Sequence, residues 1–219
     1  MLTFNEELHE YRLDGVVIPS VTTIISAVGL YEFDYVSSET LAVAAERGTI
    51  IHRCIEWYEQ GKLDESSIDP ELVGYFESYI KMKEAGLLPD KPGEIENRVC
   101  SKRFRYAGTL DQKYEGNWIN DIKTGMPGPE HGLQLSAYWL AEHEDMLTKP
   151  ERLTGCYLHR DGSIGELIDY PYDPQTWLAV LTEYVWRKKN NKISKRFFFN
   201  FYYFKNNSIF CHIFIYHFN

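Results

Sequence analysis

The chain has 219 residues, of which 44% are hydrophobic and 25% are charged, and its formal net charge is −9. These values are ordinary for a globular protein and exclude a disordered or collagen-like chain. The four cysteines stand far apart in the sequence. This spacing excludes a Cys-x-x-Cys zinc site and an iron–sulfur cluster on clustered cysteines, and it favours a reducing cytosol.

The first 15 residues have neither a basic start nor an apolar stretch, so we expect no signal peptide. No run of about 18 apolar residues occurs, so we expect no membrane span and a cytoplasmic protein. The negative net charge argues against binding of nucleic acid by the whole surface, but it allows a local basic groove.

The N-terminal half predicts a hairpin followed by helices. Residues 9–18 form the hairpin, with Asp14 and Gly15 in its turn. Ser20 is a good N-cap for a helix over 21–28, which Gly29 ends. Apolar residues at helical spacing predict two further helices, over 39–60 and 71–85.

The second half predicts strands interleaved with helices. Strands are expected at 94–103, 106–114, 118–124, 153–159 and 165–170, and helices at 130–146 and 174–186. The fold class is therefore α/β or α+β, with a short mixed sheet, a central antiparallel hairpin and flanking helices. We expect residues 1–196 to form a single domain.

Residues 197–219 differ in composition from the rest of the chain, because Phe and Tyr dominate them. Two interpretations stay open. The segment forms a terminal hairpin that turns at residues 205–208, or it is sequence that selection never shaped and is not native to the protein. We assign it no function.

The central hairpin brings acidic residues together. A three-residue turn at 115–117 places Tyr114 opposite Trp118 and Asp111 opposite Asp121. Lys123 lies two positions beyond Asp121 and so projects from the same face. Opposed carboxylates repel one another unless a cation lies between them, which predicts a metal site with an adjacent base. The alternative is an exposed polar face in which Lys123 neutralises one aspartate.

Neighbouring segments add three polar residues. His52 lies on the apolar stripe of the 39–60 helix, and Gly48, one turn earlier, leaves room for close approach. Gln134 and Tyr138 share one helix face at i, i+4 spacing. Alternatively, His52 is a core residue, and the other two belong to an ordinary helix surface.

These motifs together resemble a known family. The order GxxxH (48–52), GTLD (108–111), DIK (121–123) and QLSAY (134–138) resembles the RecB-type branch of the PD-(D/E)xK nucleases. The segment IPSVTTII (18–25) is similar to one in the phage-type exonucleases of that branch. The resemblance covers residues 9–185 and implies a restriction-endonuclease-like core. Because the cysteine cluster of some relatives is absent, no iron–sulfur cluster is implied.

The resemblance implies a role for each matched residue. It implies Mg²⁺ or Mn²⁺ bound by Asp111, Asp121, His52 and the carbonyl of Ile122, and a catalytic set of Asp111, Asp121, Lys123 and Glu96. Lys123 would orient the attacking water. Glu96 would be a further ligand or would position the water, with Glu94 as its weaker rival, and Thr124 would support the site from outside the ligand set.

Local basic residues suggest where DNA binds. The resemblance implies that Gln134 and Tyr138 position the DNA backbone. We expect further DNA contacts from Arg98, Lys102, Arg103 and Arg105, and a second basic tract lies within 187–196. Alternatively, each basic tract is an ordinary solvated face. The expected function is an exonuclease on DNA ends in phage or bacterial recombination or repair, with a recombination or annealing protein as a partner. A structure-specific endonuclease or nickase, and a DNA-end-binding module without cleavage, stay open as alternatives, as does the oligomeric state.

Overall fold

Eight strands and five α-helices make up the part of this computed structural model that is described, which covers residues 1–6, 8–31 and 36–193. The strands are β1 (Leu2–Asn5), β2 (Glu10–Leu13), β3 (Val16–Ile18), β4 (Glu94–Ser101), β5 (Tyr106–Tyr114), β6 (Trp118–Lys123), β7 (Arg152–Tyr157) and β8 (Glu166–Asp169). The helices are α1 (Val21–Val28), α2 (Ser38–Glu59), α3 (Val73–Glu84), α4 (Pro129–His143) and α5 (Pro174–Lys189), with a 3₁₀ turn, η1, at Glu65–Ser67.

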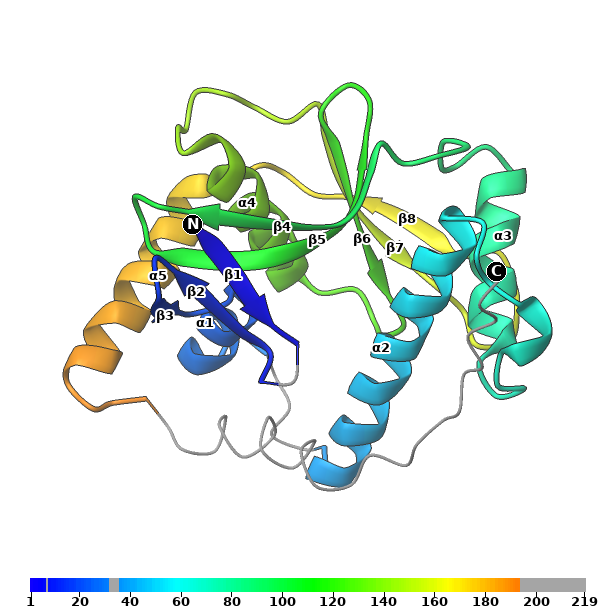
Figure 1. Cartoon of the computed structure of the whole chain (residues 1–219), viewed down its shortest axis with the longest axis horizontal. Helices are drawn as coiled ribbons and strands as arrows, with labels where there is room; N and C mark the ends of the chain where they lie inside the picture. Colours follow the sequence, from blue (N-terminus) through cyan, green and yellow to red (C-terminus); the bar gives the residue numbers. More distant parts are fainter. Residues whose placement is uncertain (7, 32–35, 194–219) are drawn as a thin grey trace.

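The main sheet has five strands in the order β4-β5-β6-β7-β8. Neighbouring strands are antiparallel except β6 and β7, which run parallel. A parallel pair needs a crossover connection, and α4 provides it. The helix follows β6 and precedes β7 in the chain, and Figure 1 shows it behind the β4–β5 part of the sheet. The end of β6 therefore leads directly into the loop before α4.

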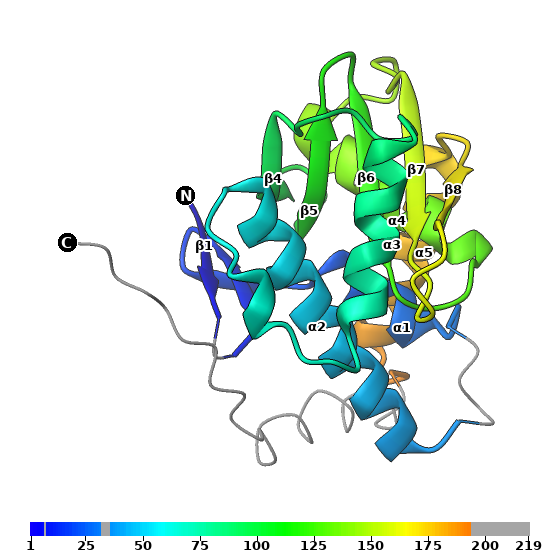
Figure 2. The same cartoon turned by 90° about the vertical axis from the view of Figure 1, so that its right-hand side faces the viewer.

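Helices cover both faces of the main sheet. Figure 2 shows α2 and α3 in front of the sheet, with α4 and α5 behind it. One apolar core joins α1, α4 and α5 to the sheet, and the other joins α2 and α3 to it around Ile122 and Cys156. This mixed α+β arrangement confirms the predicted fold class and is compatible with a restriction-endonuclease-like core.

A second sheet of three antiparallel strands, β1-β2-β3, packs beside β5. Its turn holds Asp14 and Gly15 in the left-handed region, with φ of 52° and 80°. Tyr11 packs in the core that includes Ala107 of β5, and its hydroxyl lies 2.6 Å from that of Thr109. The sequence did not predict β1, because four residues alternating between half-buried and exposed give only a weak strand pattern.

Alternation of side chains along β5 breaks at Asp111. Leu110 packs into the core on the α4 side, yet Lys113, three positions later, also reaches α4, where it pairs with Glu142. Residues three apart on a regular strand lie on opposite faces. The strand therefore changes the face it presents at Asp111.

The partner strand is irregular at the matching position. The β4–β5 register pairs Ile95 with Gln112 and Asn97 with Leu110, but it omits Glu96 and Asp111 between them. Glu96 has a φ of 49°, in the left-handed region that non-glycine residues rarely adopt. Both strands are thus locally distorted where their acidic residues meet.

Several predicted boundaries differ from the structure. The helix expected to reach residue 146 ends at His143, because Glu144 adopts a left-handed φ of 54°. The last helix runs to Lys189, three residues beyond its predicted end. Residues 197–219, for which two interpretations stayed open, lie outside the described residues. Across residues 1–6, 8–31 and 36–193, none of the helices is both long and apolar enough to cross a membrane.

Candidate active site

Asp111 lies at the point where β5 and β6 separate. The three-residue turn pairs Tyr114 with Trp118 as predicted, but the ladder ends at Gln112 and Asn120. Beyond these two residues, the Asp111 carboxylate takes the place of a backbone carbonyl as hydrogen-bond acceptor, since its Oδ2 accepts the N–H of Ile122 at 2.7 Å.

Three side chains from different elements converge beside this point. His52 of α2, Glu96 of β4 and Asp111 of β5 each offer one ligand atom, and these atoms all lie within 4.8 Å of one another. His52 Nδ1 is 3.4 Å from Asp111 Oδ1 and 3.9 Å from Glu96 Oε1. On its other side, His52 Nε2 lies 2.9 Å from the carbonyl oxygen of Ile122. We call His52, Glu96 and Asp111 the acidic cluster.

Burial and mutual repulsion perturb the acidic cluster. Burial, with the neighbouring charge of Asp111, raises the pKa of Glu96 to about 7. Burial alone would lower the pKa of His52, but the carboxylates of Asp111 and Glu96 raise it to about 9. Burial would raise the pKa of Asp111, yet the adjacent His52 lowers it below its usual value. A proton on His52, or a bound cation, therefore offsets the negative charge of the Glu96 and Asp111 carboxylates.

The acidic cluster fits a divalent cation. Carboxylate oxygens are the usual ligands of Mg²⁺ and Mn²⁺, and the imidazole makes Mn²⁺ a better match than in an all-oxygen site. The Ile122 carbonyl contacts the other ring nitrogen of His52, Nε2, and so fixes the orientation of the imidazole. A cation would also remove the repulsion that raises the pKa of Glu96.

Asp121 and Lys123 form a second group on β6. The Lys123 ammonium contacts Asp121 Oδ2 and donates to Gln134 Oε1 at 3.1 Å. Gln134 Nε2 in turn donates to Asp121 Oδ1 at 3.1 Å and to the Tyr138 hydroxyl at 2.9 Å. The Gln134 side chain of α4 thus contacts both Asp121 and Lys123 of β6.

Charges within this second group are matched. Burial raises the pKa of Asp121 to about 6 although Lys123 opposes the shift. Burial would lower the pKa of Lys123, but the carboxylate of Asp121 raises it above its ordinary value. Lys123 is therefore a cation at neutral pH.

The two aspartates divide between the groups differently from the sequence prediction. Asp121 lies outside the acidic cluster and contacts Lys123, whereas Glu96, expected as a further ligand or a water-positioning group, is one of its three members. The prediction assumed unbroken alternation along β5, and the distortion at Asp111 turns that residue toward α2. Glu94 is exposed and contacts Asn97 and Lys113, away from the cluster.

The predicted basic residues do not gather at the acidic cluster. Arg98 pairs with Glu6 at 3.2 Å and lies over the ring of Phe4. Lys102, Arg103 and Arg105 occupy the β4–β5 turn, five residues of β5 away from Asp111, which corresponds to about 17 Å of extended strand. Residues close in sequence are carried apart here because a strand rises steeply per residue.

Two residues near Lys123 were missed from the sequence. Arg47 of α2 lies five residues before His52 and contacts Thr124, the residue after Lys123. His131 of α4 lies 2.7 Å from the hydroxyl of Tyr157, which is the β7 register partner of Lys123. Burial, with the charge of Lys123, lowers the pKa of His131 to about 3, so its imidazole is neutral. Arg47 directly precedes the GxxxH motif, a position that could have singled it out.

Gly48 does not need to be glycine for reasons of space. A Cβ built there would lie 3.8 Å from Thr124 Oγ1, which is ordinary van der Waals contact. Gly108 differs, because a Cβ at that position would overlap the ring of Tyr138. The close approach that requires glycine is therefore between β5 and α4.

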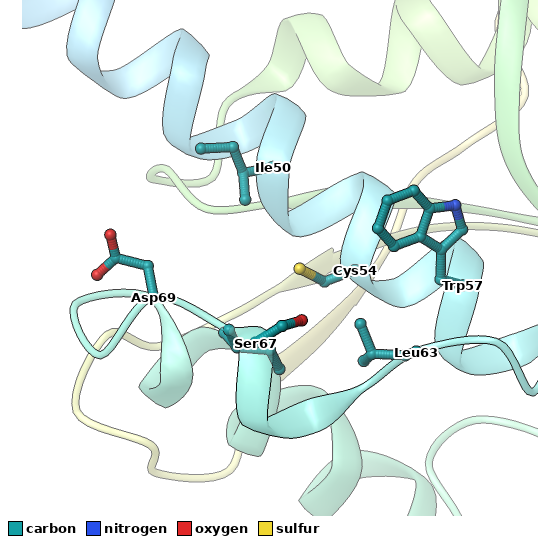
Figure 3. Close-up of a pocket in the computed structure, with 7 residues that line it drawn as sticks. Ile50, Cys54, Trp57, Leu63, Ser67 and Asp69 are labelled. Carbon is teal, nitrogen blue, oxygen red and sulfur yellow. The ribbon is translucent and has the colours of Figure 1, made fainter. Parts of the chain in front are cut away.

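Two cavities among the described residues lie apart from both groups. A small cavity of about 20 Å³ lies between α2 and the segment around η1 (Figure 3), lined by Ile50, Cys54, Trp57, Leu63, Ser67, Ile68 and Asp69. Its volume suits about one water molecule. A wider depression of about 380 Å³ lies between β3 and α5 and includes Arg105, Lys188 and Lys189.

Comparisons with known proteins found similar solved structures but no matching family or curated sequence. No model of a known protein family matches the chain, and no curated sequence matches it. Among solved structures, one described as SSO0001 is similar at a TM-score of 0.42 and 16% identity, over 78% of this chain and 75% of that one. Another, described as a "Putative exonuclease" from Eubacterium rectale, is similar at a TM-score of 0.46 and 14% identity, over 78% and 74% of the two chains.

Proposed function

We propose that this chain is a metal-dependent DNA nuclease of the RecB-type branch of the PD-(D/E)xK superfamily. The observation that carries the proposal is the placement of Lys123 one strand away from the acidic cluster. Acidic groups alone are common on protein surfaces. A half-buried acidic cluster with a fixed ammonium beside it supplies both the ligands and the positive charge that phosphodiester hydrolysis uses.

His52, Glu96, Asp111 and the carbonyl of Ile122 would hold Mg²⁺ or Mn²⁺. When bound, such a cation polarises the phosphate and lowers the pKa of water. Asp121 stays a proposed ligand, and its present contacts give it a further role in holding Lys123.

Lys123 would act on the attacking water and on the phosphate. Asp121 and Gln134 fix the ammonium from two directions, which leaves its remaining N–H free to donate to a water or a phosphate oxygen. Because negative charge grows on the phosphate as the bond breaks, a fixed cation stabilises the transition state more than the ground state. Tyr138 supports this arrangement through Gln134.

DNA would contact several residues around this centre. Gln134 and Tyr138 would position the scissile phosphate, and the turn 102–105 with Arg98 would contact DNA farther away. We propose action on DNA ends as an exonuclease of a phage or bacterium, in the cytoplasm and beside a recombination or annealing protein. The nuclease domain would comprise residues 1–196.

One gel experiment tests the proposal. Linear DNA labelled at either the 5′ or the 3′ end, nicked DNA and circular DNA would be incubated with Mg²⁺, Mn²⁺ or EDTA. Shortening from the ends of linear DNA, abolished by EDTA, is the expected result. Cutting of closed circles would instead indicate the endonuclease or nickase, and binding without cleavage in either metal would indicate a DNA-end-binding module.

A further inference from the structure

Arg47 reaches from α2 to the residue that follows Lys123. Its Nε lies 3.4 Å from Thr124 Oγ1, and a terminal nitrogen lies 3.5 Å from the Thr124 carbonyl oxygen. Both distances are long for hydrogen bonds, so these contacts hold the guanidinium only loosely. Its central carbon lies 5.4 Å from the centre of the Tyr75 ring, which supports the group without using its N–H donors.

The guanidinium has no acidic partner in the described part of the chain. Six other arginines there pair with a carboxylate within 4.0 Å, namely Arg12, Arg53, Arg98, Arg152, Arg160 and Arg187. Arg47 does not, and neither do Arg103 and Arg105 of the β4–β5 turn, although the whole chain carries nine more acidic than basic residues. An arginine has five N–H donors and suits a phosphate through two parallel hydrogen bonds. Most donors of Arg47 remain available to such a ligand.

The contact between Arg47 and Thr124 runs parallel to the contact between His52 and Ile122, at a similar spacing along both elements. His52 of α2 contacts Ile122 of β6, and Arg47 of α2 contacts Thr124, which directly follows β6. The step from His52 to Arg47 covers about 7.5 Å of helix, and the step from Ile122 to Thr124 about 7 Å of strand. Neighbouring phosphates of a DNA strand are separated by a distance of the same order.

We propose that Arg47, together with the hydroxyl of Thr124, binds the DNA phosphate next to the one that is cleaved. This assignment rests on the proposed nuclease function and gives its substrate a second fixed point. Arg47 is a positioning residue here, because it would set the register of the strand without touching the reacting atoms. Its loss should weaken DNA binding and raise KM more than it lowers kcat.

The test pairs protein variants with single neutral phosphates in the DNA. Affinity would be measured in Ca²⁺ for oligonucleotides carrying one methylphosphonate, moved stepwise along the strand, with wild type and Arg47→Ala. We expect Arg47→Ala to weaken binding of unmodified DNA about tenfold, the usual size for a charged hydrogen bond. One methylphosphonate position should weaken the wild type similarly and cost the variant nothing further.

Two further measurements sharpen the test. The slope of log affinity against log salt concentration should fall by about 0.7 to 0.9 in Arg47→Ala, the value for one lost phosphate contact. Arg47→Lys keeps the charge but not the paired donors, so its loss should be smaller. The matched control is Arg160→Ala, which removes an arginine whose side chain is 70% exposed, and it should match wild type at every position.

The inference would be overturned if, at every methylphosphonate position, the loss of DNA affinity from the modification added to the loss from Arg47→Ala. In that case Arg47 would contact no phosphate. That outcome is distinct from failure of the nuclease proposal, which the gel with Mg²⁺, Mn²⁺ and EDTA decides. The binding measurement needs no cleavage, so it tests the role of Arg47 in either case. Melting temperatures of both Arg47 variants would verify that they fold.

Discussion

The carboxylate of Asp111 accepts the backbone N–H of Ile122 at 2.7 Å, in the place where a regular ladder would supply a carbonyl oxygen. This contact leaves its other oxygen, Oδ1, directed at His52, 3.4 Å away. One side chain therefore completes the β5–β6 pairing and orients the acidic cluster at the same time.

Asp111→Asn should separate these two roles. The amide oxygen can still accept the Ile122 N–H, so the variant should fold, but it lacks the charge that attracts a cation. Removal of groups that merely orient metal ligands already costs about 10- to 100-fold, so we expect nuclease activity to fall by more than about 100-fold. Mn²⁺ should raise the melting temperature of the wild type and not that of the variant.

The control for this variant is Glu71→Gln, which removes an acidic side chain that is 81% exposed. It should keep wild-type activity and the wild-type response to Mn²⁺. An Asp111→Asn variant that cleaves DNA normally would place the metal site elsewhere.

Stability in EDTA should fall as the pH rises from 5 to 9. The folded-state pKa values of Asp121, Glu96 and His52, about 6, 7 and 9, all lie above their ordinary values of 3.8, 4.5 and 6.5. Burial causes the first two shifts, and for His52 the neighbouring carboxylates overcome burial. The folded state thus binds more protons than the unfolded state between each pair of values, so stability is lost as the pH rises through them.

Denaturant unfolding at pH 5, 7 and 9 would measure this loss. Asp111 acts in the opposite direction, because its lowered pKa gives stability that disappears only as the pH falls through the acid range. His131 also opposes the trend below pH 6.5, because burial lowers its folded-state pKa to about 3 and its contribution to stability therefore increases as the pH rises toward 6.5. Mn²⁺ should stabilise the protein more at pH 8 than at pH 6, since ligands bind a metal only when deprotonated. A free energy of unfolding in EDTA that increased toward pH 9 would contradict the assigned charges.

Lys123→Ala should remove catalysis while leaving DNA binding intact. The acidic cluster keeps all three members, whereas the ammonium held by Asp121 and Gln134 is lost. One fixed electrostatic group is typically worth about 10²- to 10³-fold in rate. Turnover in Mn²⁺ and affinity in Ca²⁺ would be measured together, with Lys62→Ala, an exposed lysine after α2, as the control. Near-normal turnover by Lys123→Ala would exclude it from the mechanism.

Gly108→Ala should act on the site through α4. The added Cβ would overlap the Tyr138 ring, whose hydroxyl accepts a hydrogen bond from Gln134. Overpacking of this kind costs about 1 to 3 kcal/mol of stability, and displacement of Gln134 should also lower kcat. Gly125→Ala is the control, because a Cβ at that position meets no atom within 4 Å. Equal melting temperatures for the two variants would show that Tyr138 moves aside freely.

Deletion of residues 197–219 tests the proposed domain boundary. If the nuclease domain ends at Arg196, activity and melting temperature should not change. Solubility should increase, because aromatic-rich segments with high β-propensity promote aggregation. A melting temperature lower by several degrees would indicate that the segment contributes to the core.

Local signals explain which elements the sequence could predict. The first helix begins where Ser20 accepts the N–H of Thr23 at 3.0 Å and ends at Gly29, whose φ is 84°. The central turn was equally predictable, because it depends only on the adjacent residues 115–117. Caps and turns of this kind are determined by a few neighbouring residues.

Distant contacts explain what could not be predicted. The break in alternation at Asp111 coincides with a gap in the β4–β5 pairing, and no pattern within β5 indicates it. The division of Asp111 and Asp121 between two groups follows from that break. Likewise, the contact between Arg47 and Thr124 depends on how α2 lies against β6, which sequence spacing does not encode.

Glu96 has a left-handed backbone conformation, which residues such as glycine and asparagine adopt more readily than glutamate does. A φ of 49° costs a β-carbon-bearing residue about 1 to 2 kcal/mol, and asparagine tolerates it more readily than glutamate does. Glu96→Asn should therefore make the protein more resistant to unfolding in EDTA while weakening its affinity for Mn²⁺. Selection for thermal stability alone would push this position away from glutamate, and engineering of a more robust enzyme should leave it untouched.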